Sequence, residues 1–219
     1  MKRLFVLVLV SAFSLTSLAC KKKDKKPAPR KTTKTLKRGA PKGEGFSFDA
    51  KATKISWTGF KFTEKAAVKG HFATFSATGK KTAKTALELL QGFSLTIDGA
   101  SVKTGRPDRD ANIAANFFKK FVGGPTITAR VLKVEGKEKG KLHVELKLSG
   151  LTKTVVFDYT LSADGKLVAN AGIDMVKFGL KAAYDSIHQA CKGFHVGKDK
   201  KSVTWTDAKL HLTTQFAKN

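Results

Sequence analysis

Alternation of apolar and polar residues is the pattern that most constrains the fold of this chain. Apolar side chains occupy every second position from Leu142 to Leu148, which places them on one face of a half-buried β-strand. Further strands, some with poorer alternation, are predicted over residues 54–62, 69–75, 93–97, 126–134, 155–161, 167–175 and 203–216. Breaks in the pattern at Gly59 and at Asp207-Ala208 are typical of β-bulges.

Short turn signals separate these predicted strands. They are Asp98-Gly99, the segment 135–140 and Ala163-Asp164-Gly165, and such signals favour antiparallel hairpins. About eight strands that each have one apolar face must stack as a sandwich or close into a barrel, and closure also removes exposed edges. The chain is therefore predicted to be all-β and antiparallel.

Two segments are predicted to be short helices. Residues 82–91 are rich in Ala and Leu and precede Gly92, a residue type that often ends helices. Residues 109–121 carry apolar side chains at four-residue spacing, and Asp108 or Asp110 is expected to cap the N-terminus of this helix.

The first 19 residues are typical of an export signal. Lys2 and Arg3 precede an apolar run that ends in small residues before Cys20. Serines and threonines interrupt the run, so a lasting transmembrane helix is the weaker interpretation. Ser17-Leu18-Ala19-Cys20 resembles the bacterial lipoprotein signal, although its Leu stands one place late, and ordinary signal peptidase cleavage fits the small residues as well.

Cys20 and Cys191 are the two cysteines of the chain. Two cysteines are too few for a disulfide scaffold, so the fold is expected to depend on a hydrophobic core. Lipidation of Cys20 would leave Cys191 as a lone thiol, whereas an unmodified Cys20 would allow a Cys20–Cys191 disulfide in an oxidising compartment. These two outcomes exclude each other.

Much of the net charge of +25 lies in a basic tail, residues 21–42, which holds eleven Lys and Arg residues and one acid, Asp24. Its prolines and lack of apolar residues predict a disordered tether over residues 20–45. The tail is expected either to attract an anionic membrane surface or to act as a solvated spacer. Nucleic acid is not expected as a partner, because export removes the protein from it.

Motifs typical of enzymes are missing from the sequence. It contains neither a serine-hydrolase elbow, nor a nucleotide-binding glycine fingerprint, nor a phosphate loop. His188, Cys191 and His195 are three soft ligands within eight residues, but a metal site usually needs convergent ligands from more than one short loop. The predictions are therefore no enzyme, no catalytic residue and no metal site.

Phenylalanine is unusually frequent, with 16 residues against two Trp and two Tyr. A structural core accounts for many of them. The functional interpretation is an eight-stranded barrel, whose interior is wide enough either to be filled by side chains or to hold one ligand. A ring-lined apolar interior suits a lipid-like guest.

The segment 104–118 resembles the signature of the YceI-like lipid/polyisoprenoid-binding family. Thr104-Gly105-Arg106-Pro107-Asp108-Arg109-Asp110 precedes a short helix that ends in the pair Phe117-Phe118. Four further landmarks agree in order: Trp57-Thr58-Gly59, Gly70-His71-Phe72 with Phe75, residues 148–153, and Phe178-Gly179-Leu180. The chain departs from the family pattern in lacking an Arg before Phe178 and in a long basic insertion over residues 182–201, so the identity of the ligand stays open.

The resemblance implies a lipocalin-like barrel over residues 46–219 that holds a polyisoprenoid or quinone-like lipid, with no other cofactor, in a bacterial periplasm or cell envelope. Cys20 would be the lipid anchor. The implied ligand-binding residues are Trp57, Phe72, Phe75, Phe93, Phe117, Phe118, Phe121, Phe178, Arg106 and Arg109. The two arginines are placed at the mouth, where they would meet a polar head, with Asp110 as an ion-pair partner; fixing the loop and capping the helix is their alternative role. The alternative function is a basic envelope protein with a solid barrel core that binds anionic lipid or polymer at its surface.

Overall fold

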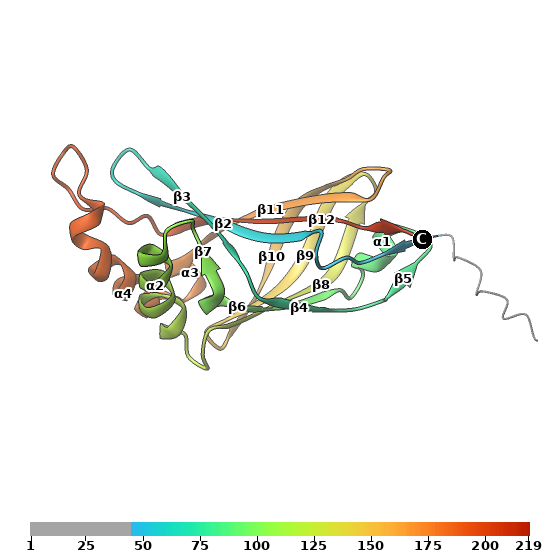
Figure 1. Ribbon diagram of the computed structural model, residues 1–219, viewed down its shortest axis with the longest axis horizontal. Coiled ribbons are helices and arrows are strands. Elements are labelled where there is room, and N and C mark those ends of the chain that lie inside the picture. The colour runs from blue at the N-terminus through green and yellow to red at the C-terminus, as the bar shows by residue number, and fades with distance from the viewer. Residues whose placement is uncertain (1–44) are drawn as a thin grey trace, which may run out of the picture. The chain divides into compact units, whose positions relative to one another are not determined.

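The computed structural model describes residues 45–219. Antiparallel strands dominate this part of the chain, and ten of them form one strongly curled sheet (Figure 1). The expectation of an antiparallel, lipocalin-like all-β fold with a few short helices is confirmed. The predicted export signal, the lipidation site at Cys20 and the basic tail lie outside the described residues.

The large sheet is continuous from β4 at one edge to β7 at the other. In spatial order its strands are β4 (Phe75–Thr78), β6 (Ser94–Asp98), β8 (Thr126–Gly136), β9 (Lys139–Leu148), β10 (Leu151–Leu161), β11 (Lys166–Asp174), β12 (Asp207–Gln215), β2 (Thr53–Lys61), β3 (Ala66–Phe72) and β7 (Val102–Lys103). Within residues 45–219 the two edge strands do not pair with each other, so the sheet is a half-barrel.

The inner face of the half-barrel carries the apolar positions of the alternating strands. In β9 the four apolar side chains from Leu142 to Leu148 are all buried. Leu167 and Ala169 of β11 are fully buried, and Phe157 and Tyr159 of β10 face the same core. Burial of one face is what fixes the register of such strands, because a shift by one residue would turn every apolar side chain outward.

The predicted bulges at Gly59 and Asp207-Ala208 are wrong. Gly59 pairs with Val68, and Asp207 and Ala208 pair with β11, all without a shift in register. The register shift lies instead in β8, between Val131 and Lys133. Gly59 lies beside Trp57, and a Cβ at position 59 would be in ordinary van der Waals contact with Cζ3 of the indole at 3.7 Å.

Two of the three predicted turns join neighbouring strands as hairpins. Gly136 and Gly165 adopt φ values of +90° and +93° in the β8–β9 and β10–β11 turns. Asp98-Gly99 does not form the expected hairpin. The carboxylate of Asp98 accepts a hydrogen bond from the N–H of Ala100 at 2.9 Å and caps a 3-10 turn, Gly99–Ser101, that leads into β7.

A small sheet and one helix lie at the end of the half-barrel where the described chain begins (Figure 1). The sheet consists of β1 (Phe46–Ser47) between β5 (Thr82–Ala83) and β13 (Ala217–Lys218). The predicted helix 82–91 is shorter than expected: α1 spans Ala86–Leu90 and begins after Thr85, whose hydroxyl accepts the N–H of Glu88 at 3.3 Å. Residues 82 and 83 pair with β1 instead of joining the helix.

Three helices gather at the opposite end of the half-barrel (Figure 1). They are α2 (Pro107–Asn116), α3 (Met175–Phe178) and α4 (Lys181–Cys191), with 3-10 turns at Phe118–Lys120 and Lys192–His195. Neither Asp108 nor Asp110 caps α2, because the helix already begins at Pro107 and both acids lie in its first turn. Within residues 45–219, none of the helices has the length and apolar character needed to cross a bilayer.

Candidate functional site

The half-barrel encloses a cavity of about 260 Å³ whose wall is almost entirely apolar. This volume lies near the lower end of the range of about 300–1,000 Å³ for small-molecule sites. Its wall is contributed by the inner face of the sheet and, at the helical end, by α2, α4 and the segment between α3 and α4. In an apolar space of this kind, hydrophobic contact rather than hydrogen bonding would hold a ligand.

A cluster of phenylalanine rings closes one side of the cavity. Phe118 is buried and lies edge-on to Phe72, Phe117 and Phe121, with ring centroids 5.4, 5.0 and 5.6 Å away. Such edge-to-face pairs are the preferred geometry of aromatic rings. Gly99 permits this packing, because a Cβ at that position would lie 2.6 Å from Cδ1 of Phe118.

Trp57 forms part of the wall on β2. Its indole lies over Gly70 of the neighbouring strand β3, and a Cβ on Gly70 would come within 2.4 Å of Cζ2 of Trp57. The two landmarks Trp57-Thr58-Gly59 and Gly70-His71-Phe72 therefore form one packing unit, in which glycine provides the space that the indole occupies.

The helical end of the cavity is its polar part. His195 and Thr204 line the wall there, and Nδ1 of His195 lies 2.7 Å from the hydroxyl of Thr204. The same hydroxyl lies 3.1 Å from Nδ1 of His188, whose ring stacks on Tyr184. Lys61 at the end of β2 also lines this end. Its charge, together with burial, lowers the pKa of His195 to about 4, with burial as the larger cause.

Stability should depend on pH through His195. The pKa of His195 is about 4 in the folded chain, against an ordinary value of 6.5. As the pH falls from 6.5 towards 4, the imidazole is therefore protonated in the unfolded chain but still neutral in the folded chain, which destabilises the fold. The stabilisation of the fold by neutral His195 is complete above pH 6.5, and its loss at low pH amounts to about 2 kcal/mol after allowance for the partial exposure of the ring. His195→Gln should therefore reduce the loss of unfolding free energy between pH 7 and pH 4.5.

Urea unfolding of the wild type and His195→Gln at both pH values measures this difference, and His71→Gln controls for removal of an imidazole elsewhere. Equal losses in the wild type and His195→Gln would contradict the assignment.

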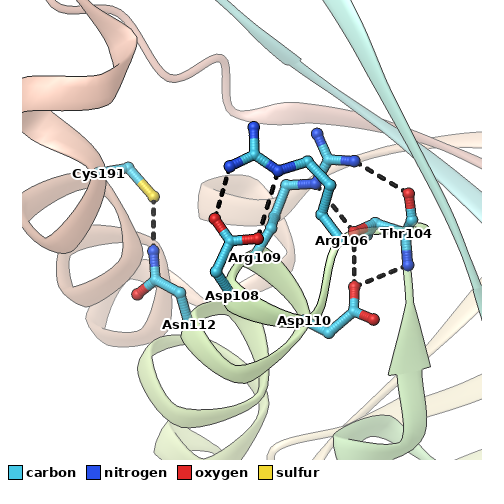
Figure 2. Close-up of polar contacts among 7 residues, drawn as sticks. All are labelled: Thr104, Arg106, Asp108, Arg109, Asp110, Asn112 and Cys191. Carbon is cyan, nitrogen blue, oxygen red and sulfur yellow. Dashed lines mark hydrogen bonds and ion pairs between the residues drawn. The ribbon is translucent and has the colours of Figure 1, made fainter.

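Cys191 joins α4 to α2 beside the cavity. Its sulfur is buried and accepts a hydrogen bond from Nδ2 of Asn112 at 3.2 Å (Figure 2). Burial raises the pKa of the thiol, and this effect outweighs those of Asn112 and Lys61. Cys191 is therefore held as a neutral packing group and not as an activated nucleophile.

A polar network fixes the start of α2 against β7. Oδ1 of Asp110 accepts the N–H of Thr104 at 2.7 Å and its hydroxyl at 2.5 Å, while Nε and Nη2 of Arg109 donate to the hydroxyl and carbonyl of Thr104, each at 2.9 Å (Figure 2). The predicted Arg109–Asp110 ion pair is therefore wrong, because both side chains bind Thr104 instead. The Thr-Gly-Arg-Pro-Asp-Arg-Asp motif thus builds the loop that holds the helix.

Seven of the ten predicted ligand-binding residues line the cavity: Trp57, Phe72, Phe93, Arg109, Phe117, Phe118 and Phe121. The other three do not. Arg106 is 65% exposed in an ion pair with Asp108, Phe178 is buried in the core beside Lys153, and Phe75 packs against the core from β4. Whether the seven bind a ligand stays a prediction.

The three soft ligands named from the sequence all lie near the polar end of the cavity, yet they do not form a metal centre. In residues 45–219 no group of three His, Cys, Asp or Glu side chains is arranged to hold a metal ion. The hydroxyl of Thr204 lies between the two imidazoles, and the thiol contacts Asn112. Sequence reasoning missed Thr204 and Lys61 as wall residues, because no local pattern distinguishes them from other strand-end residues.

Comparison with known proteins places this cavity in a recognised fold. Residues 46–213 match the model of the YceI-like domain family. A polyisoprenoid binding domain from Saccharophagus degradans, implicated in plant cell wall breakdown, aligns with 15% identity and a TM-score of 0.56 over 81% of this chain and all of that one. BcnA of Burkholderia cenocepacia aligns with 19% identity and a TM-score of 0.56 over 78% of this chain and 99% of that one. Comparison with curated proteins gave no match.

Proposed function

Because the chain belongs to the family of YceI-like domains, we propose that it binds one polyisoprenoid or similar amphiphilic lipid inside the half-barrel. The observation that carries this proposal is the ring-lined cavity of about 260 Å³ with its almost entirely apolar wall. Each methylene transferred from water into such a space contributes about 0.8 kcal/mol, so a few isoprene units bind firmly without any hydrogen bond. The structural likeness to a polyisoprenoid binding domain supports the same ligand class.

The polar end of the cavity suits the head of such a lipid. Lys61 and Arg109 line the wall there, and within residues 45–219 neither forms an ion pair with a carboxylate. Neutral His195 and the hydroxyl of Thr204 add hydrogen-bonding groups. We therefore orient the ligand with its oxygen-bearing head beside the helices and its apolar tail along the inner face of the sheet.

We propose binding without a catalytic step. The wall includes the reactive side chains Cys191, His195, Thr204 and His211. The thiol of Cys191 contacts an amide rather than a base, and His195 shares its nearest hydroxyl with a second imidazole. The hydroxyl of Thr204 lies within the distance of a nucleophile–base pair from both imidazoles, but within residues 45–219 neither ring hydrogen-bonds a carboxylate that would orient it as a base.

Location at a bacterial membrane, in the periplasm or cell envelope, completes the proposal. The export signal ending before Cys20 and the basic tail support it. A single acyl chain binds a membrane only marginally, so the polybasic run would reinforce an anchor at Cys20. Nucleic acid is not proposed as a partner.

Purification from the native host tests the proposal. Native mass spectrometry of the full mature chain should show an added mass that organic solvent extracts as an apolar molecule, and this mass should remain after a wash in 1 M salt. The bare chain alone would contradict the proposal. A partner released by 1 M salt would support the alternative of surface binding to anionic lipid or polymer, which the cavity already disfavours because that alternative requires a solid core.

A further inference from the structure

The part of the basic insertion that follows α4 presents an exposed aromatic ring among lysines. We define the basic loop as residues 192–201. Phe194 is 76% exposed and Val196 is 47% exposed, and the lysines of the loop, Lys192, Lys198, Lys200 and Lys201, are all exposed. Single exposed apolar residues are normal on protein surfaces, so it is the combination of an exposed ring with a dense positive charge that points to a partner.

The basic loop keeps an excess of positive charge, because its four lysines outnumber Asp199 and the neighbouring Glu64, which lies beside Gly197. Within residues 45–219 none of its four lysines forms an ion pair. The acid of the loop, Asp199, accepts hydrogen bonds from the hydroxyl of Thr63 at 2.7 Å and from the N–H of Lys201 at 3.1 Å. Asp199 therefore shapes the turn, and the lysines remain available to an anionic surface.

Hydrogen bonds hold the loop in a defined conformation. The N–H of Gly197 donates to the carbonyl of Lys201 at 2.9 Å, and the N–H of Val203 donates to the carbonyl of His195 at 3.1 Å. The hydroxyl of Ser202 donates to the carbonyl of Lys192 at 2.7 Å. Phe194 therefore lies on a turn that is fixed by hydrogen bonds. An ordered turn loses less conformational entropy when its side chains bind a partner.

The basic loop has one side exposed to solvent and another side that contributes to the wall of the cavity. Phe194 faces solvent, whereas the next residue, His195, lines the polar end of the cavity. Figure 1 shows the loop at the helical end of the half-barrel, opposite to α1 and β5. The basic loop therefore connects the exposed surface directly with the wall of the cavity.

We propose that the basic loop docks on an anionic lipid bilayer, with Phe194 and Val196 inserted at the interface and the lysines among the head groups. Interfacial segments combine these features, because apolar side chains enter the acyl boundary while Lys and Arg contact anionic lipids. An anionic polymer would use the lysines but would leave the phenylalanine exposed. Docking places the helical end of the cavity against the membrane, independently of which ligand the cavity holds.

Vesicle binding of the full chain tests the proposal. Cosedimentation is measured with vesicles of 30% phosphatidylglycerol in phosphatidylcholine and with vesicles of phosphatidylcholine alone. We expect binding to the anionic vesicles, about tenfold weaker binding for Phe194→Ser, and a similar loss for the triple variant Lys198→Gln, Lys200→Gln, Lys201→Gln. Because the basic tail is present in every variant, its contribution is constant across the comparison.

Matched controls separate the loop from general charge and hydrophobicity. Val156→Ser removes a side chain that is 42% exposed on the outer face of β10. The triple variant Lys137→Gln, Lys139→Gln, Lys166→Gln removes the same charge from hairpins remote from the loop. Both controls should bind within about twofold of the wild type. Circular dichroism and thermal unfolding verify that all variants are folded.

Insertion itself is measured with Phe194→Trp. Its fluorescence should be quenched by lipids brominated on their acyl chains, beyond the quenching seen in the parent chain that contains Trp57 and Trp205. Unchanged binding by Phe194→Ser would overturn the proposal: if the lysine variant alone weakened binding, the loop would be an electrostatic contact for anionic polymer or surface charge. Equal binding by every variant would assign membrane contact to the basic tail and would also overturn it.

Discussion

Ala129→Trp is expected to empty the cavity of lipid while the chain stays folded. Ala129 lies on β8, where it pairs with Leu95 and Leu146, and its small side chain leaves part of the cavity wall open. An indole at this position would occupy the space of about one five-carbon unit. The loss of that burial costs about 4 kcal/mol, or roughly a thousandfold in affinity. The occupied fraction in native mass spectra of the copurified complex measures the effect.

Ala129 is chosen for this substitution because a larger side chain there would extend into the cavity rather than into the packed core. Ala169 also lines the cavity, but it is fully buried, so a larger side chain there would overpack the core and destabilise the fold. Leu132→Trp is the matched control on the same strand, because Leu132 is 40% exposed and does not line the cavity. Full lipid occupancy in folded Ala129→Trp would mean that the lipid is bound elsewhere. Should that variant fail to fold, Ala208→Phe on β12 applies the same test from the opposite wall.

The strands were predictable because one face of each is buried and the other is not. In β9 every apolar residue from Leu142 to Leu148 faces the core, so the local alternation of apolar and polar residues is enough to predict the strand and its buried face. The position of the bulge was not predictable in this way. Gly59 looked irregular in the sequence, but it pairs with Val68 in regular register, and a Cβ there would be in ordinary contact with the indole of Trp57. The position where the indole requires glycine is Gly70 on the neighbouring strand, which local sequence does not reveal.

The helix α4 was missed although its sequence contains a signal for it. Its buried residues, Ala183, Ile187 and Cys191, recur at four-residue spacing, which is typical of one face of a helix. The signal is weak because it extends over only these three positions and because the segment continues into a loop that contains four lysines. The ring-lined side of the cavity, in contrast, followed from the resemblance carried by residues 104–118.

The polar end of the cavity could be predicted only in part, because it is assembled from residues that are far apart in the chain. Lys61, Arg109, His195 and Thr204 come from β2, α2, a 3-10 turn and the approach to β12. Arg109 was expected at the mouth from the resemblance carried by residues 104–118, whereas Lys61 and Thr204 belong to no motif that indicates a ligand. The pairing of Asp110 with Thr104 rather than with Arg109 likewise depends on where β7 ends, a tertiary fact that charge spacing along a helix does not contain.

Phe118→Ala is expected to give the largest loss of stability among the ring residues, whereas Phe117→Ala should act mainly on the cavity. The ring of Phe118 is 6% exposed and is enclosed by Phe72, Phe117, Phe121 and Gly99. Its removal leaves a hole that the surrounding backbone cannot close, at a cost of about 3–5 kcal/mol. For a domain with an unfolding free energy of about 5–15 kcal/mol, this is about a fifth of the total or more.

Phe117 lines the same cavity but is only half-buried, so its truncation enlarges an existing space instead of creating a new one. We expect a loss of about 1–2 kcal/mol for Phe117→Ala. Urea unfolding of the delipidated chains measures both values, since bound lipid would add its own stabilisation to each. Equal losses for the two variants would contradict the distinction, because they would mean that both rings belong equally to the packed core and that the cavity does not reach the ring cluster. A larger loss of unfolding free energy for Phe118→Ala would identify the ring of Phe118 as part of the packed core. The more exposed ring of Phe117 would then be the one that contacts the lipid.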